Sequence, residues 1–413
     1  MSILGKMKAG TSLSALPLAM PRHATDKRTM SSHAEFEIFL AVPPGLEATL
    51  CDEVRAAGFA APVIVPGGVV LHGGWPEVWR ANLVLRGATR VLARIGAFRV
   101  LHLAQLDKRA RRVDWASVLR PDVPLRVEAS CKASRIYHAG AAKQRIETAL
   151  REPLGAPIAT DAAPDEAAPE LRIKARIEDD LCTLSIDTTG EALHKRGHKQ
   201  AMGKAPLRET LAALFLRQCG YDGTEPLVDP MCGSGTFVIE AAEIAAGLHP
   251  GRSRRFAFEE LAGFDAAAWQ AMRQAGPGLA PAPAPAPDLR FYGSDRDAGA
   301  VRMAQANADR AGVSALTAFR CHAISDLARP EGPPGLVMVN PPYGARIGER
   351  KLLFALYGAL GKTLSERFRG WRVGIVTSDP ALAKATGLPF LPPAPPIAHG
   401  GLKVTLYRTA PLA

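Results

Sequence analysis

The chain has 413 residues, of which 47% are hydrophobic, and it carries a formal net charge of +11 at pH 7. This length predicts two or three domains, and the apolar runs fall short of the roughly 18–20 residues that a membrane-spanning helix needs. The positive charge favours a polyanionic partner.

Residues 1–33 contain only a short apolar patch around residues 13–20, so we expect a disordered tail there and no cleaved signal. The six cysteines form no Cys-x-x-Cys pair and show no metal-ligand spacing with histidine. Buried thiols in a reducing cytoplasm are the simplest account. We therefore expect a cytoplasmic protein with no metal site and no membrane segment, and we favour a monomer.

Two small α/β units are expected in the N-terminal half, residues 34–105 and residues 106–195. Their strands and helices are predicted from alternating or helical spacing of apolar residues. In chain order these elements are a strand at 35–42, a helix at 45–57, a strand at 125–129, a helix at 139–151 and strands at 171–175 and 182–187.

Basic residues concentrate in two stretches of this half. Between residues 86 and 112 the only acid is Asp107, and residues 194–199 form a second cluster beside the expected domain junction. Such clusters neutralise phosphates and release counterions, although a solvated basic face is the alternative. The residues that we predict to bind RNA are Arg86, Arg90, Lys108, Arg109, Arg111, Arg112, Arg135, Lys195, Arg196 and Lys199.

A strand at 227–228 leads into a glycine turn and then a helix. The turn contains Gly233 and Gly235, which let the backbone approach a ligand, and the helix beyond offers free N–H donors. The dinucleotide spacing Gly-x-Gly-x-x-Gly is absent because position 238 is Val, and no P-loop lysine follows. The turn suits the amino-acid end and sulfur of S-adenosylmethionine (SAM).

The later strands are spaced as in an open parallel sheet. They are expected at 290–295, 320–326 with its loop, 336–339 and 371–377, and a closing hairpin is expected around 400–407. Strands that alternate with helices indicate a doubly wound sheet, with its ligand crevice at the strand C-terminal ends. Asp295, at the end of the second strand, is placed to bond both ribose hydroxyls.

The connection between the strand at 227–228 and the strand at 290–295 is longer than one helix requires. Residues 258–274 predict a helix-bearing insertion, and residues 277–287 are a Pro/Ala run with no core-forming pattern. We expect a surface loop inside one C-terminal domain, residues 200–413.

Asn340-Pro341-Pro342-Tyr343 directly follows the strand at 336–339. The amide oxygen of Asn340 and the carbonyl of Pro341 can accept the two N–H hydrogens of a planar exocyclic amine, which favours a pyramidal nitrogen with an available lone pair. The prolines hold the chain extended, and Tyr343 can stack on a flat substrate. The alternative is a proline-rich turn with a rim tyrosine.

Together, these motifs resemble the class I SAM-dependent RNA methyltransferases that carry an N-terminal THUMP domain. The likeness is greatest to bacterial enzymes that methylate N2 of a guanine in 23S ribosomal RNA. It covers the chain from about residue 36 to the end and includes segments 134–138, 187–190 and 193–197. It implies a ferredoxin-like and THUMP α+β RNA-binding region followed by a Rossmann-like catalytic domain.

The resemblance also implies a set of site residues. Those expected to bind SAM are Pro206, Thr210, Asp229, Pro230, Met231, Cys232, Gly233, Ser234, Gly235, Thr236, Asp295, Arg296, Ala323 and Asp326. Related enzymes often place an acid near the adenine, and here either Asp326 or a carbonyl near Ala323 is available. The catalytic residues are Asn340, Pro341, Pro342 and Tyr343.

Four other functions remain open at this point. A tRNA guanine-N2 methyltransferase would share the same architecture. A DNA amino-methyltransferase would need a target-recognition domain, and a protein-glutamine methyltransferase a small helical N-terminal bundle; neither resembles the N-terminal half. A non-catalytic RNA-binding assembly factor would retain the fold without the reaction.

Overall fold

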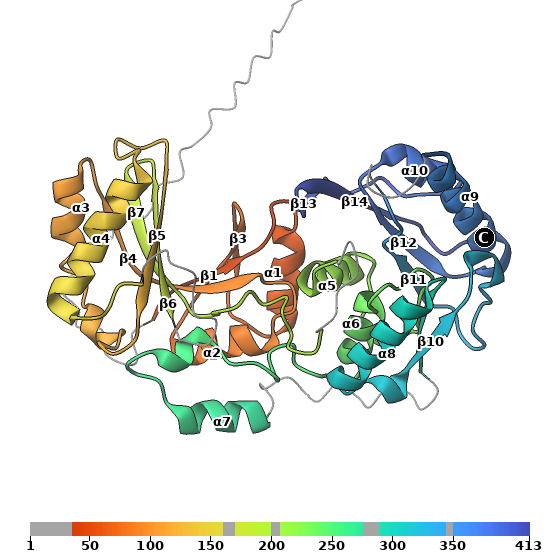
Figure 1. The fold of residues 1–413 in the computed structure, drawn as a ribbon, viewed down its shortest axis with the longest axis horizontal. Coiled ribbons are helices and arrows are strands. Elements are labelled where there is room, and N and C mark those ends of the chain that lie inside the picture. The colour runs from red at the N-terminus through yellow and green to blue at the C-terminus, as the bar shows by residue number, and fades with distance from the viewer. Residues whose placement is uncertain (1–34, 160–169, 200–206, 276–288, 344–349) are drawn as a thin grey trace, which may run out of the picture.

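The computed structural model describes residues 35–159, 170–199, 207–275, 289–343 and 350–413 (Figure 1). The predictions for the tail at 1–33, the Pro/Ala run at 277–287 and Pro206 therefore lie outside the described residues. No helix in the described ranges is long and apolar enough to cross a membrane.

The N-terminal half is built on one seven-stranded sheet with the order β2-β3-β1-β4-β7-β6-β5. Alternation of buried and exposed residues along strands such as β6 gives the sheet one apolar face. The strands are β1 Phe36–Ala41, β2 Val63–Val65, β3 Gly68–Gly73, β4 Arg90–Arg99, β5 Leu125–Lys132, β6 Leu171–Glu178 and β7 Leu181–Asp187.

Strand β4 joins the two predicted N-terminal units into this single sheet. It pairs with β1 on one side and with β7 on the other, with a register shift between Arg94 and Gly96 in the second ladder. The ferredoxin-like and THUMP parts therefore share a continuous hydrogen-bonded sheet, although the chain passes between them at about residue 105.

Four helices cover this sheet: α1 Glu47–Ala56, α2 Trp75–Val84, α3 Leu103–Ala110 and α4 Ala139–Leu154. Helices α3 and α4 lie side by side at the end of the molecule farthest from the second sheet (Figure 1). The side chains of His102 and His138 accept hydrogen bonds at their N-termini, and Gly155 ends α4 in the left-handed conformation.

The C-terminal half contains a second seven-stranded sheet, with the order β10-β9-β8-β11-β12-β14-β13. Its first five strands are parallel, and β14 is antiparallel to β12. This is the doubly wound architecture that the sequence predicted. The strands are β8 Leu227–Asp229, β9 Phe291–Asp295, β10 Thr317–Cys321, β11 Leu336–Val339, β12 Arg372–Thr377, β13 Ile397–His399 and β14 Leu402–Arg408.

Helices lie on both faces of this sheet: α5 Glu209–Gln218, α6 Thr236–Ala245, α8 Ala298–Ala311, α9 Arg350–Arg367 and α10 Pro380–Ala385. The connection from β10 to β11 is an exception, because it contains only the short 3-10 helix η4 Ile324–Asp326. The prediction placed the third strand and its loop at 320–326; the strand itself begins three residues earlier, at Thr317, and ends at Cys321.

The insertion between α6 and β9 packs onto the N-terminal half. It contains the 3-10 helix η2 Ala257–Glu260 and helix α7 Ala266–Ala275, which lies beneath α2 in Figure 1. Phe258 N donates to Thr188 O at 3.0 Å, and the Phe258 ring stacks on Trp79 with centroids 6.1 Å apart. This part of the insertion therefore binds the two halves together and is not a simple surface loop.

A buried ion network fixes the same junction. Glu240 of α6 pairs with Arg86, which follows α2, at 2.8 Å and with Arg196 of the linker at 3.2 Å. Glu243, one turn along α6, pairs with Arg252 at 2.6 Å. The side chains of Glu240 and Arg196 are each only 1% exposed, so every charge in this pair depends on its partner.

We expect Glu240→Ala to lower the free energy of unfolding by about 3–5 kcal/mol, because it removes the carboxylate that pairs with the buried Arg196 and leaves Arg86 with only its longer pair to Glu243, at 3.4 Å. The control is Glu366→Ala, which removes a carboxylate that is 55% exposed and paired with Lys362 at 3.9 Å; that change should cost less than about 1 kcal/mol. Urea unfolding followed by circular dichroism measures both. Equal costs in the two variants would show that the network does not stabilise the junction.

Candidate functional site

The glycine turn after β8 is held tightly against the end of β9. Cys232 N donates to Ser294 O at 2.9 Å, and Gly235 N donates to Cys232 O at 2.8 Å. Gly233 and Gly235 have φ values of +52° and +83°, in the left-handed region that favours glycine. A Cβ on Gly235 would also lie 3.1 Å from the Cβ of Ala304, so the turn requires glycine for space as well.

Asp295 connects this turn to the second strand end. Its Oδ2 accepts from Gly233 N at 3.1 Å, and its Oδ1 accepts from Asp297 N at 3.0 Å. Each carboxylate oxygen retains a further lone pair, so the group can still accept hydroxyl hydrogens from a bound ribose. The structure thus brings Asp295 and the glycine turn together at one edge, as the sequence predicted.

Asp229 lies beneath the turn and is almost fully buried. Its Oδ1 accepts from Met231 N at 3.1 Å. Burial raises the pKa of Asp229 to about 8, and the nearby Asp295 acts in the same direction. This carboxyl therefore shapes the turn from below and is not exposed for contact with solvent.

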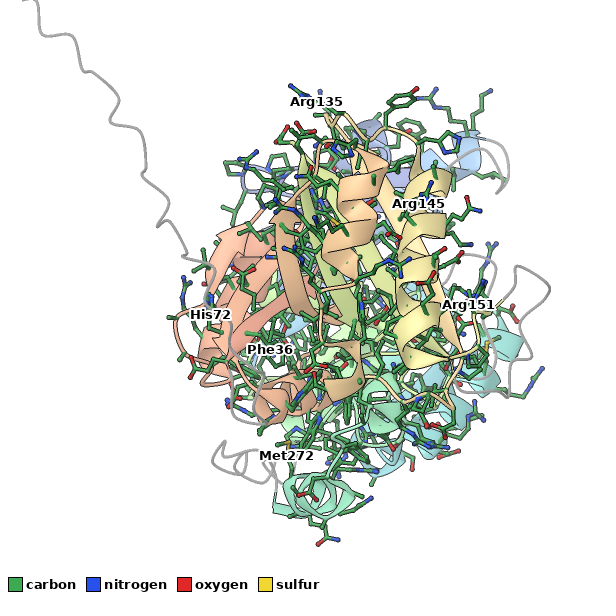
Figure 2. All side chains as sticks on the ribbon, turned by 90° about the vertical axis from the view of Figure 1, so that its left-hand side faces the viewer. Phe36, His72, Arg135, Arg145, Arg151 and Met272 are labelled. Atoms are coloured by element: carbon green, nitrogen blue, oxygen red, sulfur yellow. The ribbon has the colours of Figure 1, made fainter. Side chains whose placement is uncertain are left out.

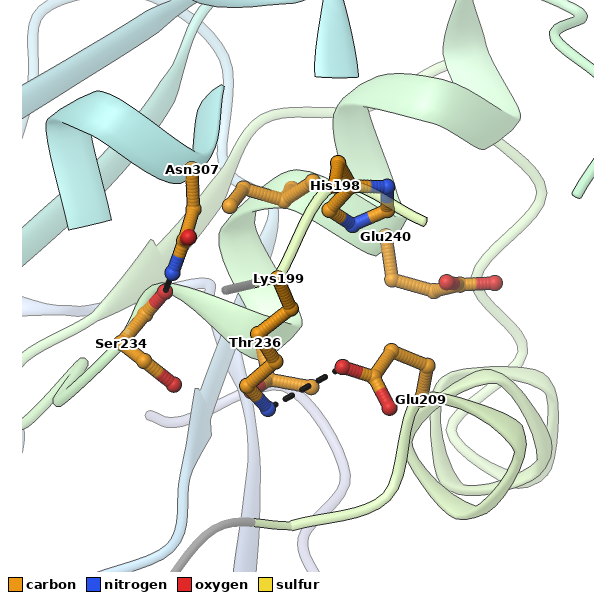
Figure 3. A pocket seen from close by; sticks show the side chains of 8 residues that line it. His198, Lys199, Glu209, Ser234, Thr236, Glu240 and Asn307 are labelled. Atoms are coloured by element: carbon orange, nitrogen blue, oxygen red, sulfur yellow. Dashed lines mark hydrogen bonds and ion pairs between the residues drawn. The ribbon is translucent and has the colours of Figure 1, made fainter. Parts of the chain in front are cut away.

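Two supporting residues were not predicted as such. Asn307 of α8 is fully buried and its Nδ2 donates to Ser234 O at 3.0 Å, which anchors the turn from behind. Lys199, predicted to bind RNA, instead donates from Nζ to Thr236 Oγ1 at 2.9 Å and lies 3.1 Å from Glu209 Oε1 (Figure 3). No local sequence pattern would have revealed either contact, because the two partners in each are distant in the chain.

The predicted adenine-binding end of the site is more exposed than the glycine turn. Asp326 is exposed and Ala323 O already lies 3.0 Å from His322 Nδ1. Asp326 also lines a cavity of about 450 Å³ together with Tyr292, Ser294, Ala318 and Arg320. These strand residues are spaced by two along β9 and β10, so their side chains lie on the same face of the sheet. Among the described residues, the β10–β11 connection has no α-helix to cover that face. The choice between Asp326 and Ala323 as an adenine partner stays a prediction.

The Asn340-Tyr343 segment lies at the C-terminal end of β11. Asn340 Oδ1 is buried and has no hydrogen-bond partner among the described residues. Pro341 is buried and Pro342 is half-buried. Tyr343 packs against both apolar cores, and burial raises the pKa of its hydroxyl. A buried acceptor without a donor costs free energy, which a ligand N–H would relieve.

Three of the predicted RNA-binding residues lie inside the domain junction. Arg86, Arg196 and Lys199 are buried in the ion pairs described above, with side chains 13%, 1% and 9% exposed. Arg90 pairs with the buried Asp187 at 2.6 Å. The structure gives these four side chains a role in holding the fold, and burial leaves Arg196 and Lys199 little surface for contact with RNA. For Arg90, which is 24% exposed, RNA binding stays a prediction.

The remaining predicted residues lie nearer the surface. Lys108, Arg112, Arg135 and Lys195 are exposed, and Arg109 is half-buried. Arg111 is paired with Asp107 and Glu152. Figure 2 adds Arg145 and Arg151 of α4, which lie with Arg135 on the side facing away from the catalytic sheet. Arg145 and Arg151 are exposed. The sequence analysis did not predict them as RNA-binding residues, because they do not fall in a basic cluster.

No group of three or more side chains suited to a metal ion occurs in the described ranges. The site therefore consists of a glycine turn, an acid at the second strand end and an unpartnered amide oxygen at the fourth. This arrangement on a doubly wound sheet defines a methyltransferase-like crevice.

The family matches agree with this architecture. Residues 37–92 match the RlmL ferredoxin-like domain, residues 102–187 match the THUMP domain, and residues 196–389 match the RMKL-like methyltransferase domain. The chain is therefore similar, in this order along the sequence, to a ferredoxin-like domain, a THUMP domain and an RMKL-like methyltransferase domain.

Individual relatives support the same assignment. The ribosomal RNA large subunit methyltransferase K/L of Chromohalobacter salexigens is 35% identical over 359 residues, which are 85% of this chain and 49% of that protein. The chain thus spans about half the length of this relative.

Two solved structures superimpose over most of the chain. SMU.472, described as a methyltransferase and solved with S-adenosylhomocysteine (SAH), has a TM-score of 0.80 and 28% identity, covering 93% of this chain and all of that one. A protein from Listeria monocytogenes, described as an N6-adenine-specific DNA methylase, has a TM-score of 0.79 and 29% identity, covering 92% and 97%.

We expect Asn307→Ala to loosen the glycine turn, because it leaves Ser234 O without its buried donor, at a cost of about 1–3 kcal/mol. If half of that cost falls on cofactor binding, SAM affinity drops by roughly tenfold or less. Calorimetric titration with SAM measures this, and Gln305→Ala on the exposed side of α8 is the matched control. Unchanged SAM affinity in Asn307→Ala would refute the anchoring role.

Proposed function

We propose that this protein transfers a methyl group from SAM to the exocyclic N2 amine of a guanosine in RNA, and that the RNA is large-subunit ribosomal RNA. The observation that carries the reaction concerns Asn340 Oδ1 at the end of β11, beside Pro341: this buried oxygen accepts no hydrogen bond from any residue that the structure describes. The relative described as a ribosomal RNA methyltransferase and the neighbour solved with SAH support the substrate and the cofactor.

In the proposed reaction the turn at 229–236 and Asp295 hold the cofactor across the strand ends. Asn340 Oδ1 and Pro341 O accept the two hydrogens of the target amine, so its lone pair points at the methyl carbon. The new N–C bond forms as the C–S bond breaks, and sulfur takes the bonding electron pair. The product nitrogen then releases one proton to water, and no strong general base is required.

The target base has to leave its stack to reach this crevice, as in other base-modifying enzymes. Tyr343, which is half-buried beside Asn340, is placed to support the face of the extruded base. Much of the rate would come from positioning, for which effective molarity can contribute about 7–11 kcal/mol.

The first test is to incubate the protein with tritiated SAM and, separately, total rRNA, tRNA, DNA and protein. We expect label in large-subunit rRNA, recovered as N2-methylguanosine after nuclease digestion. Label in tRNA, DNA or a glutamine side chain would replace the proposal with the corresponding alternative. No label in any fraction would favour a non-catalytic RNA-binding factor.

We expect Asn340→Ala to cut turnover by more than about a hundredfold, the loss typical of one essential polar contact, while SAM binding stays near normal. Asn340→Asp retains an oxygen acceptor at the same position and should keep more activity than the alanine variant. Single-turnover methylation and SAM titration measure the two effects. Turnover close to that of the wild type in Asn340→Ala would exclude this role.

The outer helices α3 and α4 are the surface proposed to bind the RNA. Lys108, Arg112, Arg145 and Arg151 are exposed there, and phosphate contacts of this kind give salt-dependent affinity.

Changing any one of these four residues to alanine should weaken RNA binding and reduce the slope of log affinity against log salt by about 1. Filter binding of a large-subunit rRNA fragment between low and moderate salt measures the slope. The control is Arg55→Ala, which removes an exposed side chain of α1 that pairs with Asp52. The same slope in the control and the four variants would exclude this surface.

A further inference from the structure

The end of strand β12 lies beside the Asn340-Tyr343 segment. Strands β11 and β12 are parallel neighbours, and their register runs from Leu336 opposite Arg372 to Val339 opposite Ile375. The pairing ends at Val339 opposite Ile375, so Asn340 leaves β11 at the same edge of the sheet where β12 ends at Thr377. Asp379 follows β12 by two residues and is therefore an acid at the same strand-end edge as the predicted catalytic residues.

A chain of contacts connects Asp379 to Tyr343. Asp379 N donates to Thr377 Oγ1 at 3.3 Å, and the hydroxyl of the buried Tyr357 donates to the same oxygen at 3.2 Å. Tyr343 packs on the core that contains Tyr357. Burial raises the pKa of Tyr357, and the nearby Tyr343 and Asp379 raise it further, so all three groups lie within electrostatic range.

One oxygen of Asp379 is available to a ligand. Oδ1 caps helix α10 by accepting from Ala381 N at 2.8 Å. The nearest cation to Oδ2 within the described ranges is Arg350 Nη2 at 3.9 Å, and that arginine side chain is 75% exposed. The Asp379 side chain is itself about one-third exposed, at 33%. Oδ2 is thus partly exposed at the strand-end edge of the sheet, and the described residues place no cation closer to it than Arg350.

The chemistry of the bases gives this oxygen a use. Guanine presents a donor, N1–H, directly beside its 2-amino group. Adenine and cytosine present an unprotonated ring nitrogen beside their exocyclic amines. An ionised carboxylate can only accept hydrogen bonds. The carboxylate can therefore accept a hydrogen bond from guanine N1–H. When adenine or cytosine is held by its exocyclic amine, the carboxylate instead faces the lone pair of an unprotonated ring nitrogen, and the two acceptors repel each other.

We propose that Asp379 selects guanine by accepting N1–H while Asn340 and Pro341 hold the 2-amino group. Asp379 is a specificity-determining residue of the proposed reaction, on which this inference depends. It explains how one amine-binding segment discriminates among bases that all carry a planar amine. A site that requires a hydrogen bond commonly rejects an analogue lacking it by large factors.

The test compares two RNA oligonucleotides that differ at the nucleotide mapped by the labelling experiment. One carries guanosine there, and the other carries 2-aminopurine riboside, which keeps the 2-amino group but has an unprotonated N1. Asp379→Asn preserves the cap of α10, because Asn is as good a helix cap as Asp. With its oxygen on the cap, the amide of Asn presents its NH2 group in place of Oδ2, and this group can donate to the unprotonated N1 of 2-aminopurine but cannot accept N1–H of guanine.

We expect the wild type to methylate the guanosine RNA at least about a hundredfold faster than the 2-aminopurine RNA. Asp379→Asn should bring this ratio below about tenfold, through slower turnover of guanosine and faster turnover of 2-aminopurine. Asp379→Ser, which also retains a helix cap, should lower the ratio as well, because its short hydroxyl does not reach N1. SAM titration shows that each variant is folded.

The control is Asp114→Asn, the same change at an acid that caps a 3-10 helix in the N-terminal half; its ratio should equal that of the wild type. A wild-type ratio in both Asp379 variants would overturn the inference. Loss of turnover on both RNAs in variants that still bind SAM would also overturn it. If the wild type makes no N2-methylguanosine at all, the proposed function itself fails, and the two failures are thereby distinguished.

Discussion

The buried carboxylate of Glu240 holds two guanidinium groups that come from different parts of the chain. Arg86 belongs to the N-terminal sheet, and Arg196 belongs to the linker that follows the THUMP part. Glu240 is on α6, the helix that begins at Thr236 directly after the glycine turn. The helix that begins at the predicted SAM-binding turn is therefore the same helix that holds the N-terminal half. A change at this contact would affect both domain orientation and the turn.

Three kinds of polar group that are distant in sequence lie at the strand ends. The glycine turn offers backbone donors, Asp295 offers acceptors, and Asn340 offers a buried acceptor with no partner of its own. Lys199 and Asn307 hold the turn in place from behind without facing the crevice. Because parallel strands all end at one edge, a short connection after each is enough to assemble the site.

The sequence was sufficient to predict the parallel strands in chain order and to place the glycine turn, Asp295 and Asn340 at strand ends, because apolar runs followed by Gly, Asp or Asn have strong local signals. The ligand-binding roles of these residues stay predictions. The sequence was insufficient for Arg86, Arg196 and Lys199, which have the composition of an RNA-binding cluster. Their burial depends on Glu240 and Glu209, which are distant in sequence, and charge counts carry no information on such pairs. The misplacement of β10 has a similar origin, since its edge position leaves its residues half-exposed and without clear alternation.

The pairing of β4 with both β1 and β7 has a consequence for substrate choice. Because the strands of the ferredoxin-like part and of the part that carries α3 and α4 form one hydrogen-bonded sheet, we expect these parts to move as one body. The ion network around Glu240 holds that sheet against the C-terminal domain. The surface of α3 and α4 that we propose to bind RNA therefore lies at a fixed distance from the Asn340 segment. Under that proposal, an RNA bound at α3 and α4 presents only those nucleotides that span this distance, so the fold of the RNA selects the position and the catalytic site selects the base.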